Sequence, residues 1–166
     1  DNSIKDIVII KAQTSLGKTR TYCQMVRDRD VNKKPILIAA PSVKLQEEIY
    51  DNLYRQGVNV YKTISLKHML PRIGLQELGD EIQELYNHGF GFEAKGNIRE
   101  FIKNSKANLY LYQREMLEQY MNEKNNLDGT RHVITTHAMF MALPENILRQ
   151  YEVIVDEDIL FTLFKN

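Results

Sequence analysis

VIIKAQTSLGKTRTYC, residues 8–23, passes from a short apolar run through a glycine-containing loop into a segment of helical character. Within it, AQTSLGKT (12–19) follows the spacing of a phosphate-binding loop, with Ala12 in place of the usual first glycine. In such a loop, backbone N–H groups and the positive end of the next helix face phosphate anions. The alternative is an ordinary strand–turn–helix connection that happens to carry a lysine.

This loop predicts a site for ATP and Mg²⁺. The Lys18 ammonium would reach the β- and γ-phosphates, and the Thr19 hydroxyl would bind Mg²⁺. The residues expected to surround the phosphates are Ala12, Gln13, Thr14, Ser15, Leu16, Gly17, Lys18 and Thr19.

Short apolar runs alternate with helix-like segments along much of the chain. The runs that indicate buried strands are 6–10, 35–40, 58–63, 132–136 and 151–156. Helical patterns follow the first two, at 18–30 and 42–57, and Ser42 and Gly57 are suited to begin and end the second helix. Runs this short and rich in β-branched residues are typical of a parallel sheet covered on both faces. We therefore predict an α/β fold, a mostly parallel sheet with helices on both faces.

Residues 66–130 interrupt this alternation and predict a helical insertion. Leu75, Leu78, Ile82 and Leu85 form an apolar helical stripe with acids opposite. A glycine-rich turn follows at 89–96, and residues 97–126 have the pattern of one or two further helices. The insertion would be a subdomain on the α/β core.

The run YEVIVDEDIL (151–160) carries three consecutive acids, Asp156, Glu157 and Asp158. Ligands of open parallel sheets bind at the carboxyl ends of the strands, so these acids should face the loop at 12–19. Asp156 would help to hold Mg²⁺, and Glu157 would orient and deprotonate an attacking water. A simple acidic turn after a buried strand is the alternative.

The composition excludes several classes of protein. Lys plus Arg and Asp plus Glu both number 22, so no overall positive charge indicates a nucleic-acid partner. Cys23 is the only cysteine, which excludes an internal disulfide and an all-cysteine metal cluster. No apolar run approaches the ~18 residues of a membrane span, and no signal-peptide pattern is present. We therefore expect a cytoplasmic protein with no membrane partner.

Four stretches resemble motifs of the superfamily 2 helicases, in the order of that family. AQTSLGKT resembles motif I, and ILIAAPSVKLQEEIY (36–50) resembles motif Ia, with Pro41 and Ser42 at its turn. HVITTHAMF (132–140) is similar to the strand and Thr/His turn before motif II, and VDED (155–158) to a D-E-x-D motif II. The resemblance implies that residues 1–166 are the first RecA-like P-loop NTPase domain, a fragment of a longer DExD/H-type helicase.

The resemblance also implies partners for this domain. Single-stranded nucleic acid, with DNA favoured over RNA, would contact Pro41, Ser42, Thr135, Thr136 and His137. A second RecA-like domain of the parent chain would complete the ATPase, so that the isolated fragment would bind nucleotide weakly and hydrolyse ATP weakly or not at all. Alternatively, Ser42 would only cap a helix and His137 would be a satisfied structural histidine. The insertion resembles that of the iron–sulfur helicases, but a chain with one cysteine lacks the four ligands of their cluster.

Other functions stay open at this point. Lys95, Arg99, Lys103 and Lys106 form a basic helix face that would guide a nucleic-acid strand, with Tyr110 and Tyr112 stacking on bases, or would simply be solvated. The chain as a whole would be an ATP-dependent helicase, another P-loop motor such as a viral DNA-packaging or conjugation ATPase, or a non-catalytic RecA-like binding module. The presence of Lys18, Thr19, Asp156 and Glu157 together favours the enzyme.

Overall fold

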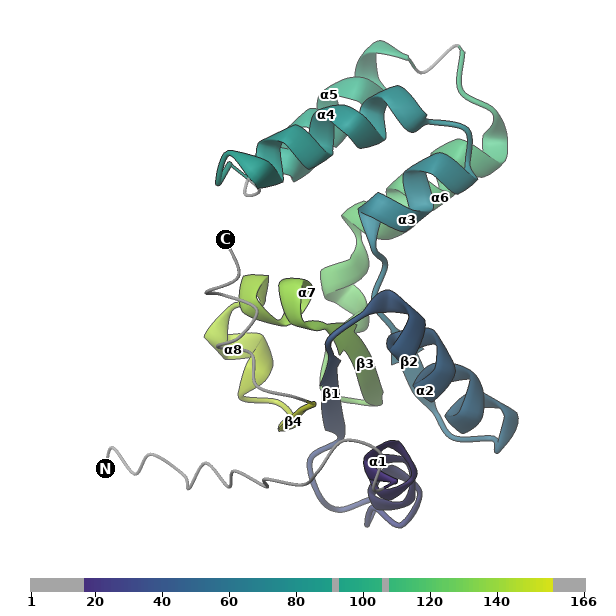
Figure 1. Ribbon diagram of the computed structural model, residues 1–166, viewed down its shortest axis with the longest axis vertical. Helices are drawn as coiled ribbons and strands as arrows, with labels where there is room; N and C mark the ends of the chain where they lie inside the picture. Colours follow the sequence, from purple (N-terminus) through teal and green to yellow (C-terminus); the bar gives the residue numbers. More distant parts are fainter. Residues whose placement is uncertain (1–16, 91–92, 106–107, 157–166) are drawn as a thin grey trace.

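The structure, a computed structural model, describes residues 17–90, 93–105 and 108–156 of the chain. Within them, four parallel strands form one sheet in the order β2-β3-β1-β4 (Figure 1). The strands are β1 (Ile36–Ala40), β2 (Val60–Lys62), β3 (His132–Thr136) and β4 (Glu152–Val155). This confirms the predicted α/β fold and four of its strands. The predicted strand at 6–10 lies outside the described residues.

The strands β1 and β4 differ in their burial. β1 lies between β3 and β4, with Ile38 opposite Ile134 on one side and Ile154 on the other. All five residues of β1 are completely buried, as expected for an aliphatic strand covered on both faces. β4 is the edge of the described sheet, and Val153 and Val155 are 36% exposed. The prediction of a fully buried strand was therefore wrong for β4.

Helices cover both faces of the sheet. On one face, α1 (Lys18–Arg27) and α2 (Val43–Arg55) pack against Ile36, Ile38 and Ile134. On the other face, Leu37 and Val133 pack with residues of α7 (His137–Ala142) and α8 (Glu145–Leu148). Successive side chains of β1 point to opposite faces of the sheet, so Leu37 lies on one face and Ile36 and Ile38 on the other. The core therefore has two layers, one on each face.

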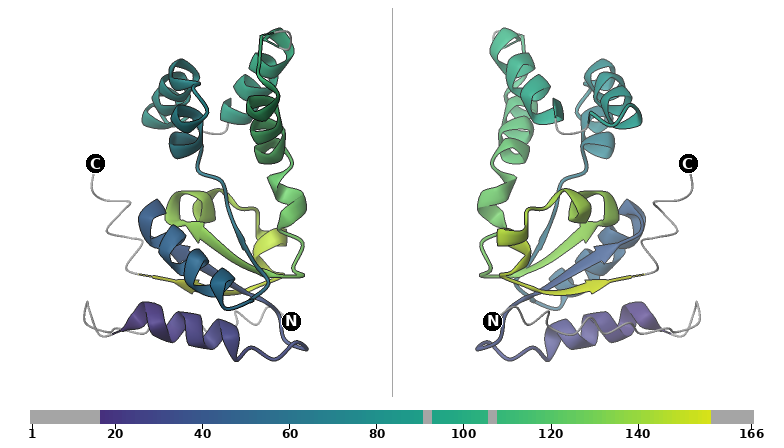
Figure 2. Two further views of the ribbon diagram at one scale, coloured as in Figure 1. Left: turned by 90° about the vertical axis from the view of Figure 1, so that its right-hand side faces the viewer. Right: turned by 90° about the vertical axis from the view of Figure 1, so that its left-hand side faces the viewer.

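The region predicted as an insertion contains helices α3 (Leu66–Arg72), α4 (Gln76–Asn87), α5 (Ala94–Asn104), α6 (Leu111–Met121) and the 3-10 helix η2 (Glu123–Asn126). Helices α3 to α6 have a hydrophobic core of their own, centred on fully buried Leu70, Ile98 and Leu117. We call them the helical lobe. Helix α5 begins at Ala94, so the predicted glycine-rich turn at 89–96 extends three residues too far. Figure 2 shows the sheet between the helical lobe and α1.

Glu123 of η2 lies where the helical lobe joins the sheet. Its Oε1 accepts a hydrogen bond from the Tyr61 hydroxyl of β2 at 3.2 Å and another from the backbone N–H of Ile64. The chain enters the lobe after β2 and returns through η2 to β3, so this one carboxylate links the outgoing and the returning segment. Glu123 is completely buried, and burial raises its pKa.

None of the helices in the described part of the chain is long and apolar enough to cross a membrane.

Candidate functional site

Asp156 follows β4 directly and is held by neighbours on both sides. Its backbone N–H donates to the carbonyl oxygen of Ala39 in β1 at 2.9 Å. Its own carbonyl oxygen accepts a hydrogen bond of 2.7 Å from Nε2 of His137, the first residue of α7. Because a carbonyl oxygen only accepts, Nε2 of His137 must carry a proton. The backbone of Asp156 is therefore fixed by β1 and by the start of α7.

Lys18 and Tyr22 of α1 face the carboxylate of Asp156. They are four residues apart and so lie on the same side of the helix. Nζ of Lys18 is 3.8 Å from Oδ1 of Asp156, and the Tyr22 hydroxyl donates a hydrogen bond of 2.9 Å to the same oxygen. Asp156 is only 3% exposed, and a buried carboxylate needs compensating charge and hydrogen bonds. Lys18 supplies the charge and Tyr22 a hydrogen bond.

Gly17 turns the chain into α1. Its φ of 73° and ψ of 22° are in the left-handed region, which glycine adopts without strain. Its carbonyl oxygen accepts the backbone N–H of Thr21 at 3.0 Å, and the first turn of α1 contains no acidic residue. The positive end of α1 is therefore not neutralised by a carboxylate of its own first turn and lies beside Lys18.

Thr19 lines a groove of about 470 Å³ between α1 and α2. The α1 wall is formed by Thr19, Arg20, Cys23 and Arg27, and the α2 wall by Glu48, Asn52 and Gln56. Burial raises the pKa of the Cys23 thiol, which disfavours the thiolate form. That Thr19 binds the same Mg²⁺ as Asp156 stays a prediction.

Thr135 belongs to a buried network of hydrogen bonds. Its hydroxyl lies 2.9 Å from the hydroxyl of Thr63, and both residues are at most 3% exposed. The side-chain amide of Gln46 in α2 donates to the hydroxyl and the carbonyl oxygen of Thr63 and to the carbonyl oxygen of Ile134, each at 3.0 Å. In this structure the Thr135 side chain therefore stabilises the packing of α2 on β3 and is not accessible to a nucleic acid.

Ser42 and Thr136 begin the helices that follow β1 and β3. The Ser42 hydroxyl accepts the N–H of Leu45 at 3.2 Å, and the Thr136 hydroxyl accepts the N–H of Met139 at 3.3 Å. Ser42 is exposed, and its role as a helix cap is confirmed. His137 is 3% exposed, and its Nδ1 has no hydrogen-bond partner among the described residues. The predicted contacts of Ser42 and His137 with nucleic acid stay predictions.

The sheet brings the turns predicted to bind nucleic acid to one edge. In the paired strands, Ala40 lies opposite Thr136, and Ala39 lies opposite Val155. Half-buried Pro41 and exposed Ser42 therefore follow β1 beside the point where β3 ends at Thr136 and α7 begins at His137. Asp156 leaves β4 at the same edge. The three predicted elements are thus neighbours in space although they are far apart in the sequence.

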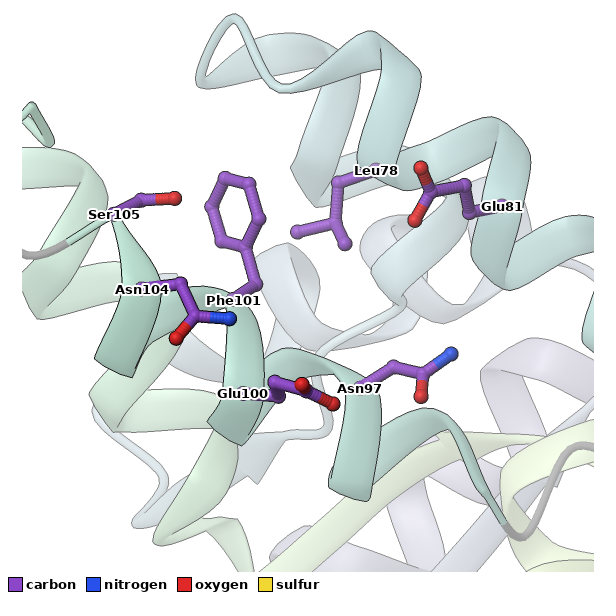
Figure 3. A pocket seen from close by; sticks show the side chains of 7 residues that line it. All are labelled: Leu78, Glu81, Asn97, Glu100, Phe101, Asn104 and Ser105. Carbon is purple, nitrogen blue, oxygen red and sulfur yellow. The ribbon is translucent and has the colours of Figure 1, made fainter.

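A second hollow, of about 280 Å³, lies between α4 and α5 in the helical lobe. In Figure 3, Leu78 and Phe101 face each other across it, and Glu81 and Glu100 lie near its rim. The remaining lining residues are Asn97, Asn104 and Ser105. Because both charged residues of the lining are acidic, this hollow does not favour phosphate or a nucleic-acid backbone.

The predicted basic face of α5 is smaller than expected. Lys95 is half-buried, with its Nζ 5.4 Å from the centre of the Tyr120 ring, and its pKa is lowered chiefly by burial. Arg99 and Lys103 are exposed, whereas Lys106 lies outside the described residues. Exposed Tyr110 and Tyr112 stack on each other, with ring centres 5.9 Å apart. Their predicted stacking on bases stays a prediction.

Of the predicted site residues, the structure brings Lys18 and Asp156 into contact. Glu157 and five residues of the predicted phosphate loop lie outside the described residues: Ala12, Gln13, Thr14, Ser15 and Leu16. Sequence reasoning missed Tyr22 and Gln46. The four-residue spacing from Lys18 could have suggested Tyr22, whereas no pattern in the sequence pointed to Gln46.

Mg²⁺ prefers oxygen ligands and keeps several waters beside one or two carboxylates. Asp156 offers one carboxylate, whose described neighbours are the Lys18 ammonium and the Tyr22 hydroxyl. No group of three or more His, Cys, Asp or Glu side chains in the described part of the chain could hold a metal ion.

Comparison with known proteins finds no matching family model, no matching curated protein and no matching solved structure.

Proposed function

We propose that this chain is the ATP-binding motor domain of a superfamily 2 DNA or RNA helicase or translocase, with a RecA-like fold. The contact between Lys18, at the start of α1, and Asp156, at the end of β4, is the observation that carries the proposal. A lysine after a glycine turn and a carboxylate at a strand end are the two side chains that a P-loop ATPase needs near the phosphates. The all-parallel sheet supports the same proposal.

Each of the chain's own residues has a role in this proposal. The start of α1 and the Lys18 ammonium bind the phosphates, and Lys18 turns from Asp156 toward them. Asp156 would help to hold Mg²⁺, and Glu157 orients the attacking water and accepts its proton. Mg²⁺, when bound, would neutralise charge on the phosphate oxygens.

The proposed track for nucleic acid is the edge of the sheet where β1 and β3 end. Short polar residues and backbone N–H groups at such turns can bind phosphates without reading bases. Ser42 is exposed there, whereas the side chains of Thr135 and His137 are buried. We therefore assign the contacts to the backbone where β1 and β3 end, at 41–42 and 136–137, and to the Ser42 hydroxyl. Because the track and Asp156 share this edge, strand binding and hydrolysis can influence each other.

Nucleotide binding by the 166-residue chain tests this proposal first. Titration with a fluorescent ADP analogue should show binding that Lys18→Ala abolishes and that Lys67→Ala, at an exposed lysine of α3, leaves unchanged. Equal binding by wild type and Lys18→Ala would overturn the phosphate site. No binding by the wild type would overturn the proposed function.

ATP hydrolysis with and without single-stranded DNA, single-stranded RNA and duplex DNA then tests the motor. Stimulation by one polymer would support a helicase or translocase and identify its track. Hydrolysis that is equal in all conditions would favour another P-loop motor. Binding of a polymer without any hydrolysis would favour the non-catalytic module, although an isolated domain without a second RecA-like domain is itself expected to be slow.

A further inference from the structure

Two side chains of different character share the same oxygen of Asp156. The Lys18 ammonium is 3.8 Å from Oδ1, longer than the ~2.7–2.9 Å of a strong charged hydrogen bond. The Tyr22 hydroxyl is 2.9 Å from it, an ordinary hydrogen-bond distance. The Lys18 side chain is 24% exposed on a flexible stem. Lys18 is thus the looser partner and Tyr22 the closer one.

The Tyr22 ring is fixed by the core. It packs against the cluster that includes Ile36 and Ile38 of β1, and it is half-buried. A tyrosine has only two side-chain torsions, so a packed ring leaves the hydroxyl little freedom. The hydroxyl therefore stays near the carboxylate of Asp156 while the Lys18 side chain can move.

We propose that Tyr22 is a positioning residue, which holds the Asp156 carboxylate in place when Lys18 leaves it to bind phosphate. This inference rests on the proposed function, because it assumes that Lys18 and Asp156 belong to a nucleotide site. Without Tyr22, the departure of Lys18 would leave a buried carboxylate without a partner on Oδ1 from α1. Such a carboxylate would be free to rotate, and this rotation would weaken its hold on a cation.

The backbone contacts of Asp156 explain why one hydroxyl is sufficient. The N–H of Asp156 is bonded to Ala39 and its carbonyl oxygen to His137, so the Cα is already fixed. What remains free is the rotation of the carboxylate about its side-chain torsions. The Tyr22 hydrogen bond to Oδ1 restricts that rotation.

Tyr22→Phe tests the proposal because it removes the hydroxyl and keeps the ring. The measurement is the affinity of the 166-residue chain for a fluorescent ADP analogue, once with Mg²⁺ and once with EDTA. For the wild type, Mg²⁺ should tighten binding. In Tyr22→Phe this tightening should shrink by about tenfold, the effect of one hydrogen bond to a charged group, while the affinity in EDTA stays unchanged.

Tyr54→Phe is the matched control, since Tyr54 of α2 is 64% exposed and stacks on Tyr50 away from Asp156. It should bind as the wild type does under both conditions. In an Asp156→Ala background, Tyr22→Phe should cause no further change, because the group that it positions is gone. Circular dichroism of each variant checks that the fold is kept.

The outcomes separate the two proposals. If the wild type binds nucleotide with the help of Mg²⁺ and Tyr22→Phe shows the same Mg²⁺ dependence, the positioning role is overturned and the proposed function stands. If Tyr22→Phe weakens binding equally with Mg²⁺ and with EDTA, Tyr22 is only structural, and the positioning role is again overturned. If the wild type binds no nucleotide, both proposals are overturned together.

Discussion

The side-chain amide nitrogen of Gln46 lies 3.0 Å from both the hydroxyl and the carbonyl oxygen of Thr63, at a buried position. The same nitrogen donates to the carbonyl oxygen of Ile134 at 3.0 Å. One side chain of α2 thereby donates to two backbone carbonyls, one just after β2 and one in β3, the second of which also accepts the N–H of Thr63. These hydrogen bonds fix α2 against the edge of the sheet from which the turns at 41–42 and 136–137 emerge.

Replacing Gln46 by Leu should therefore destabilise the fold. The substitution leaves the carbonyl oxygen of Thr63 buried without this donor, whereas that of Ile134 keeps the N–H of Thr63, and we expect a loss of about 1–3 kcal/mol in the free energy of unfolding. Urea denaturation followed by circular dichroism measures it. Gln76→Ala, on the exposed side of α4, is the control and should change stability by less than about 0.5 kcal/mol. Equal stability of the two variants would show that the network is unimportant.

The elements whose signals are local could be predicted from the sequence. β3 occupies the predicted residues 132–136, and β1 differs from the prediction only by Pro35. β1 is a short aliphatic run between two prolines, and β3 is a short run rich in β-branched residues. Both signals come from neighbouring positions in the sequence. Ser42 was predicted to begin α2, because a cap acts on the N–H groups of the next few residues.

The polar contacts inside the protein could not be predicted in this way. Gln46, Thr63 and Glu123 are buried, although their residue types are usually exposed. Their partners lie on other elements, so nothing within a short window of sequence indicates them. The contact of Lys18 with Asp156 was predictable only because both residues lie in stretches that resemble motifs with a shared ligand. Tyr22 belongs to none, and its contact depends on how α1 packs beside β4.

Glu123 should make the stability of the protein depend on pH. Burial is the largest cause of its raised pKa, and the hydrogen bonds from Ile64 and Tyr61 and the charge of Lys95 oppose that rise. The pKa of this carboxyl is higher in the folded than in the unfolded state. Its contribution to stability is therefore greatest at a pH where it is protonated in both states. This contribution to stability is present below about pH 4.5, the ordinary pKa of a glutamate, and is lost as the pH rises through the pKa of the folded state.

Glu123→Gln measures this effect, since the amide is neutral at every pH and keeps an oxygen that can accept from Ile64 and Tyr61. We expect the free energy of unfolding of Glu123→Gln to rise relative to the wild type as the pH increases from below 4.5 to neutral. Chemical denaturation at several pH values gives the two profiles. Glu115→Gln, on the exposed side of α6, should follow the wild type. Parallel profiles for Glu123→Gln and the wild type would contradict the argument.

Replacing each of two glycines by alanine should change the stability of the protein in opposite directions. Gly17 has φ +73°, and Gly96 lies inside helix α5, while an added Cβ meets nothing within 4 Å at either position. Gly17→Ala should cost about 1 kcal/mol, because a side chain strains the left-handed conformation. Gly96→Ala should instead stabilise the protein by up to about 1 kcal/mol, because alanine favours the helix. Thermal unfolding of both variants tests the pair. If both substitutions changed the stability in the same direction, the backbone conformation of the glycine would not decide the effect of alanine.

Glu157→Gln should separate nucleotide binding from hydrolysis. The amide keeps the size of the side chain but cannot take the proton of an attacking water, so hydrolysis should fall by about 10²–10⁴-fold. Binding of ATP should stay near the wild-type value, since Lys18 and the start of α1 are unchanged, and the variant should retain ATP. Filter binding of labelled ATP and release of phosphate measure the two steps on one sample. Glu145→Gln, at an exposed glutamate of α8, should hydrolyse ATP as the wild type does. Hydrolysis by Glu157→Gln at the wild-type rate would remove Glu157 from its role as the base and would move the search to Asp158, the other acid of the same strand end.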